Sequence, residues 1–131
     1  MKKICSLLII SILLLLFSTY AFAAEAIPYS DSVFTSGTAS LSTRKTVNFS
    51  LRTLDTQGAI KITSCWLQKK DGTIWRFAKS LDIPSQVAIN ATSYAASMDY
   101  SSAIGSGTYR IGFIANADGH TITRYSNERT Y

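Results

Sequence analysis

The sequence predicts an all-β protein: a single antiparallel β-sandwich of about six to seven short strands, following an N-terminal signal helix. Three observations predict it. The first 23 residues have the parts of an export signal. Later segments alternate apolar and polar residues, as strands with one buried face do. Clusters of Gly, Asn and Asp separate these segments at short intervals, which is typical of turns between strands.

Residues 1–23 predict a secretory signal peptide. A start with two lysines is followed by an apolar stretch over residues 4–17, and Ala21 and Ala23 stand where a signal peptidase needs small side chains. The sequence therefore indicates a protein exported by a bacterial-type signal and secreted to the extracellular space.

We expect cleavage after Ala23, with Ala26 as the alternative site. An uncleaved anchor is the competing interpretation, because residues 4–22 approach the roughly 20 needed to cross a bilayer. Cleavage leaves residues 24–131 as one secreted domain with no membrane attachment, long enough to bury its own core.

Charge and cysteine content exclude several classes of function. The formal net charge of the chain is +5, and two of its lysines lie in the signal peptide. The remaining basic residues are interspersed with acids, which is unlike a nucleic-acid-binding face. Residues 24–131 retain one cysteine, Cys65, so no internal disulfide can form. Its apolar neighbours predict a small buried side chain rather than a reactive thiol.

The clearest strand covers residues 45–53. A loose segment precedes it, with a short first strand near Val33 or Leu41, and Gln57-Gly58 is expected to break the chain after it. Apolar and polar residues alternate strictly through the strand, so one face is buried. Its inward side chains are Val47, Phe49 and Leu51.

A hairpin is predicted from residues 59–69 and 73–79, around Lys70-Asp71-Gly72. Two registers are open. A two-residue loop at Asp71-Gly72 pairs Trp66 with Phe77 and places Trp66 inside. A three-residue loop is preferred, because it gathers four apolar side chains on one face. They are Cys65, Leu67, Trp75 and Phe77.

The preferred register has one consequence for the preceding residues. Ile60 and Ile62 have the opposite parity from Cys65 and Leu67. A β-bulge near Thr63-Ser64 would bring both pairs to the same side of the sheet.

The rest of the chain predicts three more strands. Residues 86–91 form one, with Val87 and Ile89 on one side, and residues 92–107 form a connection rich in Ser, Ala and Gly. Residues 108–115 form a second, which turns at 116–119 into a return strand over 121–126 that the tail to Tyr131 extends. The inward side chains of the second are Tyr109, Ile111, Phe113 and Ala115.

The segment Gly105-Ser106-Gly107-Thr108-Tyr109-Arg110-Ile111 resembles strand F of immunoglobulin-like domains, where a tyrosine stands two residues before a core cysteine. The resemblance puts Ile111 at that cysteine position, Phe49 at its partner on strand B, and Trp66 near the core tryptophan of strand C. Fibronectin-type sandwiches share this pattern. The sequence as a whole is also similar to small secreted bacterial β-sandwich proteins. The resemblance implies a domain that binds proteins or sugars.

The sequence contains no recognisable catalytic centre. His120 is the sole histidine and follows Asp118-Gly119, so it is expected at a hairpin tip, a poor place to hold a catalytic group. The acids stand singly in predicted turns, and no metal-ligand spacing is present. We therefore expect no enzyme activity, no cofactor and no bound metal.

Aromatic residues are the remaining candidates for a binding site. Each hairpin register turns one of Trp66 and Trp75 outward, so these two are the candidate ligand-binding residues. The sequence thus favours a secreted, non-catalytic binding module with a protein partner in or near the cell envelope. The alternative is a carbohydrate-binding module that uses exposed aromatics on a polysaccharide. The sequence leaves the oligomeric state open.

Overall fold

The computed structural model describes residues 33–131, so the predicted signal peptide and both cleavage sites lie outside the described residues. These residues form an all-β, antiparallel sheet of seven strands with one short 3-10 helix, η2 (Ser101–Ala103). The strands are β1 (Phe34–Leu41), β2 (Thr46–Asp71), β3 (Ile74–Ser80), β4 (Ala88–Asp99), β5 (Thr108–Ala117), β6 (His120–Tyr125) and β7 (Arg129–Thr130).

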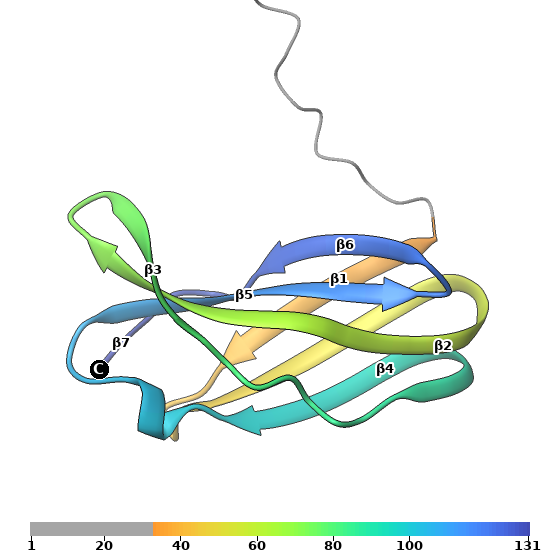
Figure 1. The fold of residues 1–131 in the computed structure, drawn as a ribbon, viewed down its shortest axis with the longest axis horizontal. Coiled ribbons are helices and arrows are strands. Elements are labelled where there is room, and N and C mark those ends of the chain that lie inside the picture. The colour runs from red at the N-terminus through yellow and green to blue at the C-terminus, as the bar shows by residue number, and fades with distance from the viewer. Residues whose placement is uncertain (1–32) are drawn as a thin grey trace, which may run out of the picture.

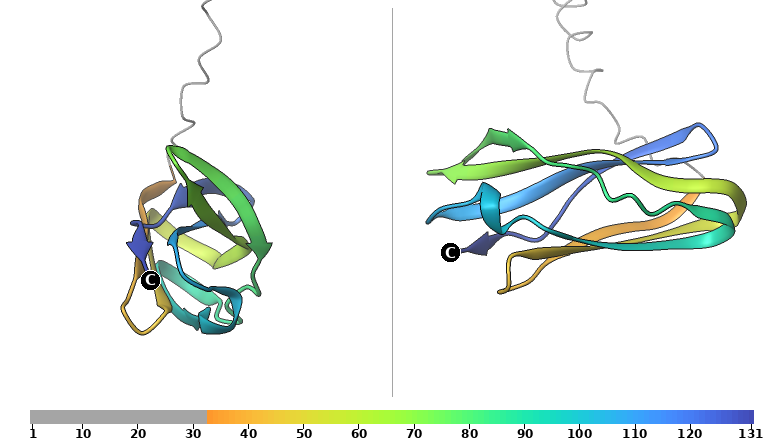
Figure 2. Two further views of the ribbon diagram at one scale, coloured as in Figure 1. Left: turned by 90° about the vertical axis from the view of Figure 1, so that its left-hand side faces the viewer. Right: turned by 60° about the horizontal axis from the view of Figure 1, so that its bottom comes forward.

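The long strand β2 organises the whole sheet. Its first half pairs with β1 and β4, and its second half pairs with β5 and β3. The pairing with β4 also continues past the bend to Ile60. Figure 1 shows β2 turning back between these halves. In Figure 2, right, β1, the first half of β2 and β4 lie in one layer, and the second half of β2 with β3, β5 and β6 lies in the other.

The core lies between the two layers. Phe49 of the first layer meets Phe113 of the second edge-to-face, with ring centroids 5.2 Å apart. Within residues 33–131, no helix has the length and apolar character to cross a membrane. The buried apolar residues are Ala39, Leu41, Val47, Phe49, Leu51, Ile60, Ile62, Cys65, Leu67, Tyr94, Tyr100, Tyr109, Ile111, Phe113, Ala115, Ala117 and Ile122.

Several predicted elements are confirmed. Val47, Phe49 and Leu51 alternate inward along the first half of β2, and the predicted inward residues of 108–115 are all buried in β5. The pairing of β2 with β5 shifts between Ile62 and Ser64, at the predicted bulge. That bulge is what lets both isoleucines and Cys65 enter the same core.

The expected chain break at Gln57-Gly58 is wrong, because β2 continues through it as a bend. The pairing with β4 shifts between Arg52 and Gln57 and then resumes. Asp118 of the β5–β6 turn holds the bend: its carboxylate accepts hydrogen bonds from the backbone N–H groups of Gly58 at 2.5 Å and Ala59 at 2.9 Å. Two residues that suggest a turn are here stabilised in a strand by a distant side chain.

The expected connection over residues 92–107 is also wrong in its first half. β4 runs from Ala88 to Asp99 and pairs along both halves of β2. Val87 and Ile89, expected on one side of the strand, are both exposed, and the buried aromatic of β4 is Tyr94. The small Ser and Ala residues that suggested a loop lie mostly on the outer face, where they need no apolar partner.

Neither predicted hairpin register is correct. The loop is Gly72-Thr73, with Asp71 opposite Ile74, and Gly72 adopts a φ of 62°. A two-residue loop that begins with such a glycine gives a tight turn whose twist suits antiparallel strands. Consequently Lys70 lies opposite Trp75, and Gln68 lies opposite Phe77.

The observed register separates the four side chains that the preferred register gathered on one face. Cys65 and Leu67 are buried, whereas Trp75 is half-buried and Phe77 is 64% exposed. Trp66 is also outside the core, on the opposite side of β2 from Cys65, so the core tryptophan that the resemblance implied is absent at this position.

Candidate functional site

Both candidate tryptophans lie on the outer face of the layer formed by β3, β2, β5 and β6. Successive residues of a strand point to opposite sides. Because Cys65 and Leu67 point into the core, Trp66 and Gln68 point outward, and Trp75 shares that side through its pairing with Lys70. The structure therefore brings Trp66 and Trp75 to one face, where sequence reasoning expected one or the other.

Arg110 of β5 links this face together. Its guanidinium carbon Cζ lies 4.5 Å from the centroid of the Trp75 ring and 4.2 Å from that of the Tyr125 ring. Its Nε donates a hydrogen bond of 2.7 Å to Oε1 of Gln68, the residue directly opposite on β2. A guanidinium stacked on two aromatic rings and fixed by a side-chain amide is held in one orientation.

Trp66 completes the cluster from the other side of Tyr125. The two rings meet edge-to-face, with centroids 6.1 Å apart and planes at 88°. Between them on β5 is Gly112, which pairs with Trp66 on one side and Tyr125 on the other. We call this set the aromatic face. It consists of Trp66, Gln68, Trp75, Arg110 and Tyr125.

Charged residues border the aromatic face. Lys70 forms an ion pair with Glu128 at 3.1 Å and also lies 5.4 Å from the centroid of the Trp75 ring. Beyond Trp75, the hairpin carries exposed Phe77 and an Arg76–Asp71 ion pair at 2.7 Å. An apolar and aromatic centre with a charged rim is the usual anatomy of a protein interface.

Sequence reasoning missed Arg110, Tyr125 and Gln68. Arg110 lies between the buried residues Tyr109 and Ile111, so its outward position followed from the alternation. The side chains next to Arg110 could not be predicted in this way, because they depend on the registers of β2 with β5 and of β5 with β6. The correct registers of β2 with β5 and of β5 with β6 would have predicted the cluster.

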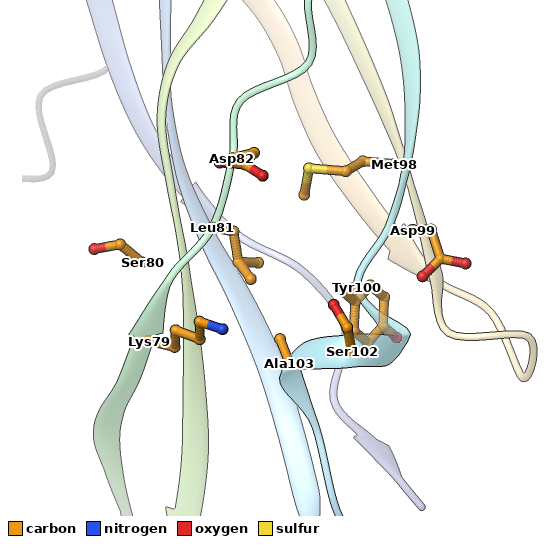
Figure 3. Close-up of a pocket in the computed structure, with 9 residues that line it drawn as sticks. All are labelled: Lys79, Ser80, Leu81, Asp82, Met98, Asp99, Tyr100, Ser102 and Ala103. Atoms are coloured by element: carbon orange, nitrogen blue, oxygen red, sulfur yellow. The ribbon is translucent and has the colours of Figure 1, made fainter.

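A separate hollow of about 280 Å³ lies between the chain segment at the end of β3 and the segment that joins β4 to η2. Figure 3 shows Asp82 on the segment that follows β3 and Asp99 at the end of β4, on different walls of the hollow. Oδ1 of Asp99 accepts hydrogen bonds from the backbone N–H and the hydroxyl of Ser101, which hold the pKa of Asp99 below its usual value. This carboxylate orders the entry to η2, and a lowered pKa is the opposite of what a general acid needs.

The other titratable candidates lie apart from one another. His120 is exposed at the tip of the β5–β6 hairpin, as predicted. Cys65 is buried as predicted, and burial raises the pKa of its thiol to about 12, so the unreactive thiol form prevails at neutral pH. Among residues 33–131, no three His, Cys, Asp or Glu side chains are grouped so as to hold a metal ion.

No protein-family model, curated protein or solved structure matches this chain.

Proposed function

We propose that the protein is a secreted, non-catalytic binding module that recognises a protein partner in or near the cell envelope through the aromatic face. The observation that carries the proposal is the fixed stack of Trp75, Arg110 and Tyr125 on an open sheet surface. Trp, Tyr and Arg are the residue types that contribute most to protein interfaces. A side chain that is already ordered loses little entropy when a partner binds it.

The same geometry favours a protein over a polysaccharide. A sugar-binding platform offers exposed, coplanar ring faces. Here Arg110 covers a face of both Trp75 and Tyr125, and the Trp66 ring stands at 88° to the Tyr125 ring. The cluster thus presents a mixed aromatic and cationic surface, which suits the side chains of a protein better than the flat side of a sugar ring.

We also propose that the two layers form an immunoglobulin-like sandwich. In support, Phe49 and Ile111, which the resemblance puts at the positions of the missing disulfide, are both buried. The position of Trp66 on the outer face departs from the pattern. In this proposal the strand-C tryptophan has been moved from the core to the binding surface.

Site-specific photo-crosslinking in expressing cells tests the proposed function. A photoreactive residue replaces Thr123, which is exposed on β6 beside the aromatic face. The control replaces Ser50, exposed on the first half of β2. We expect one discrete crosslinked protein from position 123, absent from position 50 and lost when Arg110→Ala is added. Equal products at both positions, or none, contradict the proposal.

Retention on cell-wall preparations and insoluble polysaccharides tests the alternative. Wild type, Trp66→Ala and Trp75→Ala are compared after each is shown to be folded. Retention by wild type that either substitution abolishes would replace the protein partner with a carbohydrate ligand.

A further inference from the structure

The strand β3 has an unpaired edge. Among residues 33–131 it pairs with β2 alone. Asp71 and Ile74 flank the two-residue loop, so their backbones form a hydrogen-bonded pair. In an antiparallel ladder such pairs alternate with non-hydrogen-bonded pairs, so Trp75 and its partner Lys70 form the next, non-hydrogen-bonded pair. By the same alternation, the backbone N–H and C=O groups of Trp75 and Phe77 point away from β2. These groups are free to pair with another strand.

The side chains at this edge favour an interaction rather than protection. Ile74 is 57% exposed and Phe77 is 64% exposed, although large apolar side chains are usually kept off free edges. The register shift that follows Phe77 ends the regular stretch. Residues 74–77 therefore form a short edge that can accept a few residues of a partner strand but not a long sheet extension.

The charge around the edge selects the kind of partner. Four cations lie on the two strands of the hairpin. Two carboxylates lie near them, and both already form ion pairs: Asp71 of the hairpin with Arg76, and Glu128 before β7 with Lys70. The cations are Lys69, Lys70, Arg76 and Lys79. A hollow of about 370 Å³ among Lys69, Arg76 and Phe77 lies beside them. The remaining positive charge is complementary to an acidic segment.

We propose that the free edge of β3 binds an extended, acidic segment of the partner protein, which adds a strand to the layer. Backbone hydrogen bonds to Trp75 and Phe77 would supply affinity, and alternate side chains of the added strand would lie beside the aromatic face. This inference rests on the proposed function and specifies its mode of recognition. It also explains why Trp75 serves both the face and the edge.

Selection from a displayed library of random peptides against the protein, expressed as the full chain, tests the inference. We expect the selected peptides to be acidic with alternating apolar residues, and to bind less well as salt is raised. The key variant is Phe77→Pro, because proline removes the outward N–H without removing a hydrogen bond to β2. Phe77→Ala is the matched control, since it loses the same ring but keeps the N–H.

We expect Phe77→Pro to bind the selected peptides about tenfold more weakly than Phe77→Ala, the equivalent of a lost backbone hydrogen bond. If Phe77→Pro does not fold, the charge reversal Lys79→Glu serves instead and should weaken binding of the acidic peptides. No selected peptides, non-acidic peptides, or equal binding by the proline and alanine variants would overturn the inference. The inference would also be overturned if Trp66→Ala or Arg110→Ala abolished binding of the selected peptides while Phe77→Pro and Lys79→Glu left it unchanged. That result would leave the proposed function intact.

Discussion

The indole ring of Trp66 lies against the backbone of Gly112, so closely that a Cβ atom at position 112 would stand 2.4 Å from ring atoms Cε2 and Cζ2. Gly112 is buried and lies between Trp66 and Tyr125 in the sheet. The missing side chain is what allows the two rings to meet over the strand. The aromatic face thus depends on a residue that contributes no side chain to it.

Gly112→Ala should therefore displace Trp66. Overpacking of this kind lowers the free energy of unfolding by about 1–3 kcal/mol. Because the ring is half-exposed and can swing outward, we expect a value at the lower end, together with a change in tryptophan fluorescence. Urea unfolding and emission spectra of the variant measure both effects.

Gly105→Ala is the control for this substitution. A Cβ atom at position 105 would meet nothing within 4 Å. The control should change the free energy of unfolding by less than about 0.5 kcal/mol. A Gly112→Ala variant with the same stability and emission as the control would show that Trp66 does not depend on the close approach.

Arg110→Lys should lower stability although it keeps the positive charge. Lysine lacks the planar guanidinium that stacks on Trp75 and Tyr125, and lacks the Nε that donates to Gln68. We expect a loss of about 1–2 kcal/mol from two exposed cation–π contacts and one hydrogen bond. Urea unfolding at low and high salt measures the loss.

Arg52→Lys is the matched control for the stack. Arg52 is exposed on the first half of β2, away from the aromatic face, and the substitution should be nearly neutral. Equal effects at positions 52 and 110 would mean that the stack contributes nothing to stability.

The aromatic face shows which parts of this structure local sequence patterns can predict. Alternation along a single strand is a local property, so the inward residues of β5 and the bulge before Cys65 were predictable from the chain alone. The position of the turn within Lys70–Thr73 could not be predicted from the chain alone, because several two- and three-residue loops suit the same glycine. Because the loop forms at Gly72-Thr73, Phe77 lies opposite Gln68 instead of Cys65, in solvent and not in the expected core.

Tertiary contacts explain the remaining differences. Gln57-Gly58 remains in a strand because Asp118, about 60 residues later, accepts hydrogen bonds from the backbone N–H groups of Gly58 and Ala59. The Ser- and Ala-rich residues of β4 lie in the sheet because β2 is long enough to pair with them on both sides of its bend. Neither partner is near in sequence, so local propensity favoured a loop at both places.

Alkaline pH should destabilise the protein through Cys65. Burial raises the pKa of its thiol from 9.0 to about 12. Between these values the unfolded chain loses a proton that the folded protein keeps, so the free energy of unfolding falls as pH rises from about 9 towards 12. Burial also raises the pKa values of Tyr94 and Tyr100, which adds to the loss in the upper part of this range.

Cys65→Ala separates the thiol from the tyrosines. The variant should lose about 1 kcal/mol at pH 7 from the missing buried atom. Its free energy of unfolding should then be less dependent on pH between about 9 and 10 than that of the wild type. In parallel, a thiol reagent at pH 8 should modify wild-type Cys65 only as fast as the protein unfolds. Rapid modification of the folded protein would contradict its burial.

Asp118 should stabilise the bend of β2 from the β5–β6 turn. Its carboxylate accepts two backbone hydrogen bonds from Gly58 and Ala59, while its own φ is 47°. Asp118→Gly removes the acceptors. It also relieves the backbone strain of a left-handed residue, which offsets part of the entropy that glycine adds to the unfolded chain. We expect a loss of about 1–3 kcal/mol and faster hydrogen exchange at the amides of residues 58 and 59.

Asp118→Asn should fall between wild type and Asp118→Gly, because asparagine tolerates the same backbone conformation but offers one neutral acceptor. Asp71→Asn is the control: Asp71 flanks the other two-residue hairpin loop and forms an exposed ion pair with Arg76, worth about 0–1 kcal/mol. If Asp118→Gly and Asp71→Asn have equal effects, with exchange at residues 58 and 59 unchanged, the turn does not stabilise the bend. The layers would then depend on core packing alone, and the bend would follow from the pairing of β4 with both halves of β2.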